Sequence, residues 1–250
     1  MRIFGLIGYP LSHSFSKKYF SDKFKNENIN DAEYLNFSVP SIEQFPKILK
    51  SREDFIGFNI TSPYKESIIP YLDELDATAS EINAVNVVNV IKDGKIQRLK
   101  GYNTDVYGFK KSLQKKLNPE IKSALILGTG GAARAVFFAL KSLDIKSTFV
   151  SRKEKSGNDY LQYKNLNKDV ISDNLLIVNA TPLGLFPNTE TKPDIPYSYL
   201  TENHHLFDLI YNPPLTQFLS EGKQKHTTIQ NGLEMLHFQA EKAWEIFNES

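Results

Sequence analysis

The chain has 250 residues, of which 40% are hydrophobic and 24% charged, the composition of an ordinary globular protein. Thirty Lys and Arg residues almost balance 29 Asp and Glu residues, so no overall charge favours nucleic acid or an anionic membrane. Cysteine is absent and the five histidines show no metal-ligand spacing, which excludes disulfides, thiolate nucleophiles and Cys-ligated metals. No apolar run approaches the roughly 20 residues of a membrane span, and no signal peptide is visible. We therefore expect a cytoplasmic protein without a metal.

The first hundred residues alternate strand-like and helix-like patterns. Ser41, with Gln44 three residues later, has the spacing of a capping box that opens a short helix. Asp93-Gly94 is typical of the turn of a hairpin. In chain order, the apolar spacing predicts strands over 2–8, 32–37 and 55–60, helices over 17–26, 41–49 and after Pro63, and hairpin strands over 87–91 and 95–99.

The pattern changes after Gly101. Asn103 or Thr104 can cap a helix that we expect to run through Lys116, and a last helix is expected over 232–248. Between these two helices, short apolar runs predict buried strands over 123–127, 148–150, 175–179 and 206–210. A helix whose alanines share one face follows the first of these strands. The alternation is typical of a doubly wound parallel sheet, so the fold class is α/β.

A glycine-rich turn joins the strand over 123–127 to this helix. Gly128-Thr129-Gly130-Gly131-Ala132-Ala133 fits the pattern G-x-G-x-x-[G/A]. The first glycine permits a tight turn, the second lets the backbone approach a pyrophosphate, and the small last residue permits close packing of helix on strand. A plain strand–turn–helix is the alternative. The context on both sides favours a dinucleotide-binding turn and hence a nicotinamide-dependent oxidoreductase.

The form of the cofactor is usually read about 20 residues after the glycine turn, at the end of the second strand. An acidic residue there binds the ribose 2′-hydroxyl of NAD, but this chain has Ser151-Arg152-Lys153. A guanidinium binds a 2′-phosphate through paired hydrogen bonds, whereas a carboxylate repels it. The sequence therefore favours NADP, with solvated loop charges as the alternative for the basic residues.

Four short polar segments lie outside the glycine turn. Ser12-His13-Ser14-Phe15-Ser16 directly precedes a helix, where hydroxyls and free N–H groups can hold a carboxylate; spare serines beside an ordinary N-cap would look the same. Polar side chains are costly to bury unpaired, so we expect those of the other three segments to meet in a cleft. The three segments are Asn59–Lys65, Asn83–Asn86 and Gly101–Asp105.

Eight short motifs, in the right order over nearly the whole chain, together resemble the shikimate dehydrogenase family. Any one of them is a weak signal, and the order makes the set specific. They are G-x-P-x-x-H-S-x-S at Gly8–Ser16, N-[IV]-T-x-P-[FY]-K at Asn59–Lys65, A-V-N at Ala84–Asn86, N-T-D at Asn103–Asp105, G-x-G-G-A-[SA]-R at Gly128–Arg134, N-A-T at Asn179–Thr181, D-x-x-Y at Asp208–Tyr211, and Gly232 with Gln239.

The resemblance implies a fold of two α/β domains. The N-terminal, substrate-binding catalytic domain is expected over 1–102 and 232–250, and a Rossmann-type, doubly wound NADP domain over 103–231. The C-terminal helix then returns to the first domain. This agrees with the change of pattern that the residues themselves show near residue 102.

The resemblance also implies an activity and its residues. The family reduces 3-dehydroshikimate to shikimate reversibly with NADPH, in aromatic amino-acid (chorismate) biosynthesis. Lys65 is implied as the acid/base and Asp105 as its orienting partner. The implied substrate residues are Ser14, Ser16 and Tyr211 at the carboxylate, and Thr61, Lys65, Asn86, Asp105 and Gln239 around the ring hydroxyls. The implied cofactor residues are Gly128 to Ala133, Ser151, Arg152, Lys153, Asn179, Ala180, Thr181 and Gly232.

Two motifs depart from the family pattern. The adenosine-side motif N-R-T-x-x-R keeps only Arg152, with Lys155 as a substitute for the second arginine, and the usual D-G-x-x-M begins here with Asn231. Three alternatives remain: a quinate/shikimate dehydrogenase that also uses NAD, a methylenetetrahydrofolate dehydrogenase, and a silent nucleotide sensor. The expected partner is a small-molecule substrate, without nucleic acid or membrane, and the chain is expected to be a monomer or homodimer.

Overall fold

The computed structural model describes residues 1–11, 15–94, 96–155, 157 and 159–249. The chain divides into two compact units, Met1–Thr104 with Ala240–Ser250, and Asp105–Gln239. The sequence predicts domain boundaries after residues 102 and 231, whereas these units divide after residues 104 and 239. The second division falls inside helix α8 (Leu233–Asn248), whose first turns group with the second unit and whose later turns group with the first. A continuous helix can belong to two units because its own hydrogen bonds hold it together.

The first unit contains a mixed sheet in the order β2-β1-β3-β5-β6-β4. β2, β1 and β3 are parallel, β5 runs against both β3 and β6, and β4 runs parallel to β6. The sequence predicted all of these strands except the two-residue β4. The strands are β1 (Arg2–Gly8), β2 (Ala32–Ser38), β3 (Phe55–Ile60), β4 (Glu74–Leu75), β5 (Val87–Asp93) and β6 (Ile96–Tyr102).

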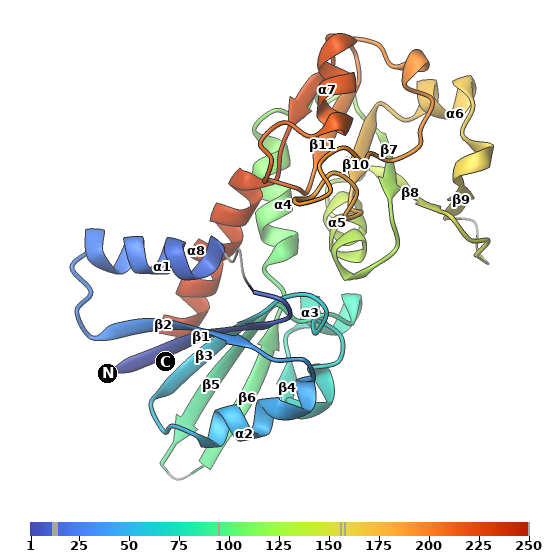
Figure 1. Ribbon diagram of the computed structural model, residues 1–250. Coiled ribbons are helices and arrows are strands. Elements are labelled where there is room, and N and C mark those ends of the chain that lie inside the picture. Colours follow the sequence, from blue (N-terminus) through green and yellow to red (C-terminus); the bar gives the residue numbers. More distant parts are fainter. Residues whose placement is uncertain (12–14, 95, 156, 158, 250) are drawn as a thin grey trace. The chain divides into compact units, whose positions relative to one another are not determined.

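Both faces of this sheet are covered by other elements. Successive side chains of β1 point to opposite faces, and those on each face are buried. Ile3 and Ile7 belong to a core cluster with the helical segments of 42–50 and 77–82, and Phe4 and Leu6 to a second cluster with α1 and the end of α8. The return of the C-terminal helix to the first domain is therefore confirmed (Figure 1). The helical segments are α1 (Phe15–Asn26), η1 (Ile42–Gln44), α2 (Phe45–Lys50), η2 (Ile69–Tyr71) and α3 (Ala77–Ile82).

Two expectations for the first unit are wrong. The helix predicted after Pro63 is a series of turns that ends in the short 3-10 helix η2, and Pro70 stands inside η2. The capping box does not form: Ser41 caps η1 by accepting from the Glu43 amide at 3.3 Å, and the α-helix starts only at Phe45. Here Pro46 stands in the first turn of α2, where a missing N–H costs nothing.

The second unit contains a fully parallel sheet in the order β12-β11-β10-β7-β8-β9. Counted from β7 as the first strand, this is the 3-2-1-4-5-6 order of the dinucleotide-binding fold. The predicted doubly wound fold is confirmed. Its elements are α4 (Asp105–Gln114), β7 (Ser123–Leu127), α5 (Gly131–Lys141), β8 (Lys146–Ser151), β9 (Tyr160–Gln162), η3 (Tyr163–Asn165), α6 (Lys168–Asp173), β10 (Leu176–Asn179), η4 (Tyr197–Tyr199), β11 (His205–Asp208), α7 (Gln217–Gln224) and β12 (Thr228–Gln230).

The parallel strands of the second unit are buried on both faces, so they appear in the sequence as continuous apolar runs rather than alternating ones. β7 and β10 are fully buried over Ala124–Leu127 and Leu176–Asn179. α5 packs on the sheet through Ala135, Val136 and Ala139, all fully buried, as the helical spacing of its small residues predicts.

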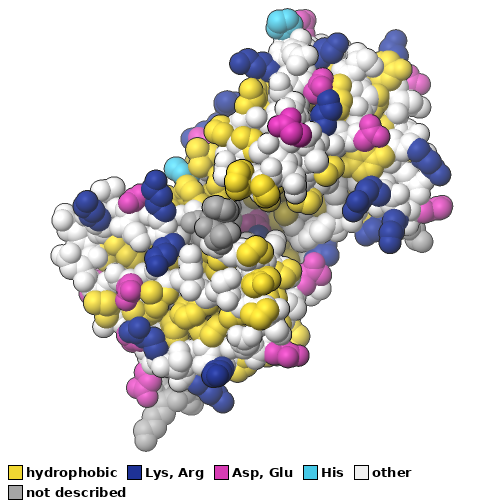
Figure 2. All heavy atoms as spheres, viewed as in Figure 1, with side chains coloured by type: hydrophobic (Ala, Val, Ile, Leu, Met, Phe, Trp, Pro, Cys, Tyr) yellow, Lys and Arg dark blue, Asp and Glu magenta, His cyan; other side chains and the backbone are white. Residues whose placement is uncertain are grey.

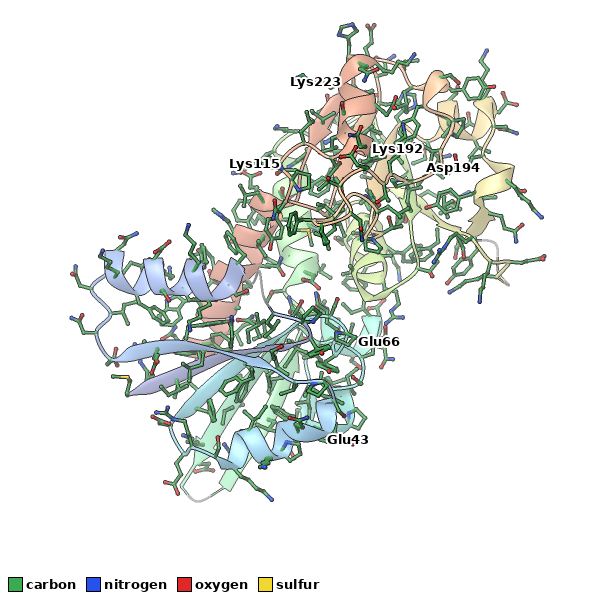
Figure 3. All side chains as sticks on the ribbon, in the orientation of Figure 1. Glu43, Glu66, Lys115, Lys192, Asp194 and Lys223 are labelled. Carbon is green, nitrogen blue, oxygen red and sulfur yellow. The ribbon has the colours of Figure 1, made fainter. Side chains whose placement is uncertain are left out.

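Most charged side chains lie at the surface, where both signs are interspersed over the visible face (Figure 2), whereas Asp105 and Asp208 are buried. Ion pairs connect neighbouring elements, for example Lys192 with Glu221 of α7. The side chain of Lys192 is labelled in Figure 3. Within the described residues, no helix is long and apolar enough to cross a membrane.

Gly57 of β3 is required by close packing rather than by backbone conformation. A Cβ at this position would lie 2.4 Å from the ring of Phe247 in α8 and 2.7 Å from the carbonyl oxygen of Val88. We predict that Gly57→Ala lowers the free energy of unfolding by about 1–3 kcal/mol, the usual cost of overpacking a core. Urea denaturation measures the free energy of unfolding. In a double variant with Phe247→Leu, this free energy should fall by less than the sum of the losses in the two single variants. Full additivity would contradict the steric explanation.

Candidate functional site

The glycine turn has the geometry that a phosphate group needs. Gly128 has φ +111°, a value that L side chains rarely adopt, and a Cβ there would lie 3.1 Å from the carbonyl oxygen of Ala180. Gly130 is exposed, with open space where its Cβ would be, and it is the N-cap of α5 without a capping side chain. The first amides of α5 are thus not satisfied by a cap, while Ala133 packs fully buried below. The residues present fit a dinucleotide pyrophosphate.

The loops after β7 and β10 meet at the point where the strand order reverses, which is the usual ligand position in an open parallel sheet. Ala180 donates from its amide to Leu127 O at 2.9 Å. Asn179 is fully buried, and its side-chain oxygen accepts from both the amide and the hydroxyl of Thr181, at 3.0 and 2.7 Å. The predicted Asn179-Ala180-Thr181 segment therefore forms a turn directly beside Gly128.

The predicted adenosine-side residues follow β8. Ser151 is buried and accepts from the Lys153 amide at 3.2 Å, which turns the backbone and leaves Arg152 and Lys153 exposed. Arg152 also lies close enough to the phenol of Tyr163 to lower its pKa, although burial raises that pKa overall to about 12. Lys155, the substitute for the missing second arginine, lies 5.7 Å over the ring of Tyr160. Arg152 is thus available for a 2′-phosphate, and Lys155 is partly engaged by an aromatic face.

Asp208 connects several groups at the same end of the sheet through hydrogen bonds, a role that its sequence motif does not indicate. It is fully buried and accepts from Asn179 Nδ2 at 3.0 Å, from the Ile210 amide at 3.0 Å and from the Thr216 hydroxyl at 2.6 Å. Burial raises the pKa of this carboxyl to about 6 against these three hydrogen bonds. Thr216 in turn caps α7. The D-x-x-Y motif was the only sequence signal for this carboxyl, which joins the Asn179 turn to a neighbouring helix.

In the first unit, topology brings the predicted polar segments to one edge of the sheet. β1, β3 and β6 end at this edge and β5 begins there, because Ile7 pairs with Ile60, Asn59 with Val87 and Val87 with Tyr102. Each predicted segment is a loop at such a strand end. The described segments of this unit therefore lie at one end of the sheet, while the meeting of their side chains in a cleft stays a prediction. Ser14 lies outside the described residues.

Hydrogen bonds connect these loops to one another and to β1. The Thr61 amide donates to Ile7 O at 2.9 Å, and the Val85 amide donates to Lys65 O at 2.7 Å. Buried Asn86 accepts at its side-chain oxygen from the Thr104 amide at 2.7 Å and donates from Nδ2 to Thr104 Oγ1 at 3.0 Å. Lys65 is half-buried. The loops thus form one connected polar edge that carries Thr61, Lys65 and Asn86.

Ser16 lies in the first turn of α1, in the first unit. Asp105, Tyr211 and Gln239 belong to the second unit. Asp105, 2% exposed, begins α4, and Gly108 one turn later packs against the backbone of Met235 and Gln239 in α8. A Cβ on Gly108 would lie 2.6 Å from Met235 O, so only glycine lets the two helices approach this closely. Asp105 and Gln239 consequently lie on adjacent helices. Burial raises the pKa of the partly buried Tyr211.

Gly232 is held tightly by the protein itself. A Cβ there would lie 2.0 Å from Leu209 O, its amide donates to Ile210 O at 3.0 Å, and its carbonyl accepts from the Leu236 amide at 2.9 Å. The amide and one lone pair of the carbonyl oxygen of Gly232 are thus already used in hydrogen bonds. Only the second lone pair of this oxygen is left to accept a hydrogen bond from a cofactor. Asn231, which replaces an acid in the family pattern, donates to Pro214 O at 2.9 Å, which an ionised carboxylate cannot do.

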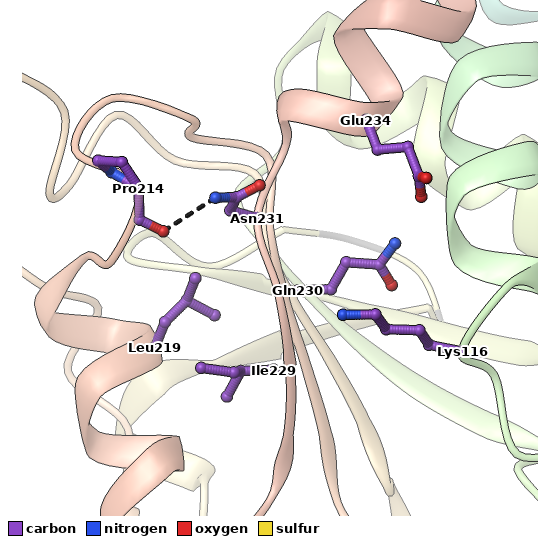
Figure 4. Close-up of a pocket in the computed structure, with 7 residues that line it drawn as sticks. All are labelled: Lys116, Pro214, Leu219, Ile229, Gln230, Asn231 and Glu234. Atoms are coloured by element: carbon purple, nitrogen blue, oxygen red, sulfur yellow. Dashed lines mark hydrogen bonds between the residues drawn. The ribbon is translucent and has the colours of Figure 1, made fainter.

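The structure also contains a pocket that holds none of the predicted site residues. It lies along β12, the edge strand of the second sheet (Figure 4). Its polar wall includes Glu234, which pairs with Lys115 at 2.5 Å. The lining residues are Lys116, Pro214, Leu219, Ile229, Gln230, Asn231 and Glu234. In the described ranges, no three His, Asp or Glu side chains are grouped so that they could hold a metal ion.

The fold and these sites define a class of protein: a two-unit α/β dehydrogenase, with a polar site at the strand ends of its first unit and a dinucleotide-binding Rossmann fold in its second. The model of the shikimate dehydrogenase substrate binding domain matches residues 6–88. A shikimate dehydrogenase (NADP(+)) of Methanosphaera stadtmanae is 37% identical over 262 residues, covering 98% of this chain and 90% of the relative. The chain belongs to the shikimate dehydrogenase family.

Solved structures agree with this assignment over the full length of the chain. Shikimate dehydrogenase from Aquifex aeolicus superposes with a TM-score of 0.87 at 34% identity, covering 100% of this chain and 93% of that one. The Thermus thermophilus enzyme in complex with NADP(H) and shikimate gives a TM-score of 0.86 at 31% identity, covering 100% and 94%. The family resemblance and the α/β fold expected from the sequence are thus confirmed.

Asp208 makes stability depend on pH in a definite direction. Its folded pKa of about 6 lies above the ordinary 3.8, so between these values the folded chain keeps a proton that the unfolded chain has lost. We predict that the free energy of unfolding of the wild-type chain falls by up to about 3 kcal/mol, relative to that of Asp208→Asn, as the pH rises from about 4 to 6. Above about pH 7 the difference should not change further. Thermal unfolding of both proteins across this range measures the difference. A constant difference, or one of opposite sign, would contradict the assignment.

Proposed function

We propose that this chain is an NADP-dependent shikimate dehydrogenase that reduces 3-dehydroshikimate to shikimate reversibly. The observation that carries the proposal is the connected polar edge of the first unit, in a chain that also has a Rossmann unit. At this edge Thr61 and Lys65 follow the end of β3, and Asn86 directly precedes β5. Family membership supports the same activity. A substrate with one carboxylate and several ring hydroxyls needs many hydrogen-bonding groups at one place, and this edge supplies them.

The residues have distinct roles in the proposal. Ser14 and Ser16 bind the carboxylate with Tyr211, and Ser16 lies in the first turn of α1. Thr61, Asn86 and Gln239 bind the ring hydroxyls. A set of fixed donors and acceptors on strand ends and helix starts orients the ring, which lowers the entropic part of the barrier.

Lys65 and Asp105 are the proposed catalytic pair. The ammonium of Lys65 stabilises the negative charge that develops on the carbonyl oxygen and provides a proton to it, while the carboxylate of Asp105 orients Lys65. Asp105 is 2% exposed at the first turn of α4, so its position is set by packing rather than by solvent. NADPH, when bound, supplies the hydride.

The glycine turn and Arg152 hold the cofactor in the proposal. The amides at the start of α5 bind the pyrophosphate, and the Asn179–Thr181 turn lies beside them. Arg152, together with Ser151 and Lys153, receives the 2′-phosphate, because the chain has no carboxylate at 151 or 152 to bind a free ribose hydroxyl.

We also propose that the protein is a monomer or homodimer and that it is located in the cytoplasm. A monomer or homodimer in the cytoplasm fits a chain without cysteine and with nearly balanced charge. Light scattering of the purified chain distinguishes the two oligomeric states.

A single assay tests the activity against its alternatives. Absorbance of the reduced cofactor is followed with shikimate, quinate and a methylenetetrahydrofolate substrate, each with NADP and with NAD. We expect turnover with shikimate and NADP well above every other pair. Comparable turnover with quinate and NAD would favour the broader quinate/shikimate enzyme, and NADPH binding without any turnover would favour a nucleotide sensor.

Lys65→Ala should lower kcat at least ~100-fold, the low end for a positioned acid/base, with a smaller change in the KM for shikimate. The physical reason is the loss of the proton and the positive charge at the reacting oxygen. Steady-state kinetics measure both constants, with Lys50→Ala, an exposed lysine of α2, as the matched control. Near-normal turnover in Lys65→Ala would remove this residue from the catalytic pair.

Arg152→Ala should raise the KM for NADPH much more than the KM for NADH, because only NADPH carries the phosphate that a guanidinium binds. About tenfold is expected from the loss of one charge-assisted interaction. The same variant assayed with NADH serves as its own control. Equal effects on both cofactors would show that Arg152 does not bind the 2′-phosphate.

A further inference from the structure

Asp208 has no role in the function proposed above, yet it stands at the end of β11 directly beside Asn179 at the end of β10. The two residues are paired in the register of the sheet, and both are fully buried. A buried carboxylate is costly unless its oxygens are hydrogen-bonded, so its partners indicate what it holds in place. Those of Asp208 belong to three different segments of the second unit.

Each of the two side chains closes a turn of its own segment. Asn179 Oδ1 accepts from the amide of Thr181 at 3.0 Å, and Asp208 Oδ1 accepts from the amide of Ile210 at 3.0 Å. In both cases the side chain binds the amide two residues later, which is the arrangement of an Asx-turn. The last residue of each strand thus fixes the direction of the loop that follows it.

A hydrogen bond between the two side chains joins these turns. A backbone amide can only donate, so the atom of Asn179 that faces Thr181 is Oδ1, and the atom that faces Asp208 is Nδ2. Nδ2 donates at 3.0 Å to Asp208 Oδ1, the same oxygen that closes the turn at Ile210. The other oxygen, Oδ2, accepts from the hydroxyl of Thr216 at the start of α7, at 2.6 Å. One carboxylate oxygen therefore holds both turns.

In the proposed function, the two turns serve different ligands. The turn that begins at Asn179 lies against the glycine turn, where a Cβ on Gly128 would be 3.2 Å from Thr181 Cγ2. The turn that begins at Asp208 leads directly to Tyr211, for which we propose a contact with the substrate carboxylate. Asp208 is thus bonded both to a turn on the cofactor side and to a turn on the substrate side.

We propose that Asp208 is a positioning residue that fixes the cofactor-side turn at Asn179 and the substrate-side turn before Tyr211 in one arrangement. Without the shared oxygen, both turns lose the bond that orders them before the ligands bind. Each ligand must then order its own turn on binding, which lowers its affinity. The inference rests on the proposed function, since it needs these two turns to contact the cofactor and the substrate.

Asp208→Ala tests the proposal because it removes the shared oxygen. We expect the KM for NADPH and the KM for shikimate to rise together by about tenfold, the equivalent of one buried hydrogen bond for each turn. The value of kcat should change less than about threefold, because Lys65 is untouched.

The matched control is Thr216→Val, which removes the hydrogen bond to the other carboxylate oxygen and the cap of α7. It should lower the melting temperature but change both KM values less than about twofold. A tenfold rise in this variant as well would show that the KM values follow stability alone. A rise for only one ligand in Asp208→Ala would show that the two turns are independent. Either result would overturn the inference.

Asp208→Asn keeps the shape of the side chain and decides the question if Asp208→Ala does not fold. Its amide oxygen can replace Oδ1, but it is a weaker acceptor than an ionised carboxylate. Titration calorimetry at pH 8 should therefore give Kd values for NADP+ and for shikimate about threefold above those of the wild-type chain.

The same comparison at pH 5 adds a readout that a loss of stability would not produce. The partners of Asp208 are an amide side chain, a backbone amide and a hydroxyl, which carry no charge, and burial raises the pKa of its carboxyl to about 6. At pH 5 the wild-type carboxyl is therefore protonated, and the two proteins should bind each ligand equally.

Equal affinities of the two proteins at pH 8, or the same ratio of Kd values at both pH values, would overturn the inference and leave the proposed function standing. Absence of shikimate turnover and of shikimate binding in the wild-type chain would overturn the proposed function and this inference with it.

Discussion

The structure depends on one constraint, the common direction of its parallel strands. Because the strands of a parallel set all end at one edge, the loops that follow them meet there, however far apart they are in sequence. In the first unit Thr61 and Lys65 follow parallel strand β3, and antiparallel strand β5 begins at the same edge and adds Asn86. In the second unit the Gly128 turn lies beside the Asn179 turn. In each unit the placement of the polar loops follows from strand direction and connection, and the side chains add the chemistry.

Holding polar groups at such an edge requires partners for every buried donor and acceptor. Asp208 satisfies Asn179, Ile210 and Thr216 at once, and Asn86 does the same for Thr104 while its carbonyl accepts from Asn59 and Ile60. Hydrogen-bonded buried groups of this kind stiffen loops that would otherwise be mobile. A rigid polar edge is what a shikimate dehydrogenase needs, because its own residues must position the substrate and supply a proton while the hydride comes from the cofactor.

Much of the fold could be predicted because its strands are apolar runs bounded by turn residues. β1 and β3 agree with the expected ranges, and the Asp93-Gly94 hairpin forms with Gly94 at φ +61°. The errors lie where local signals compete. Pro63 suggested a helix start, but the following residues form turns, and Ser41 had a capping-box partner in Gln44 that it does not use. Motif residues could be named because each motif is local, whereas Asp208 could not be given a role because its partner Asn179 is distant in sequence.

The sequence by itself determined the class of cofactor site, the family and the identity of the polar residues, because spacing over a few residues is enough to specify a strand, a glycine turn and a helix start. Only the tertiary structure decided the strand order, the division of α8 between two units, and the buried hydrogen bonds of Tyr34 with Asn59 and of Asp208 with Asn179. These bonds join residues that are 25 and 29 positions apart, and they depend on the direction in which each buried group can donate. Such information arises only when packing brings the partners together and excludes water from between them.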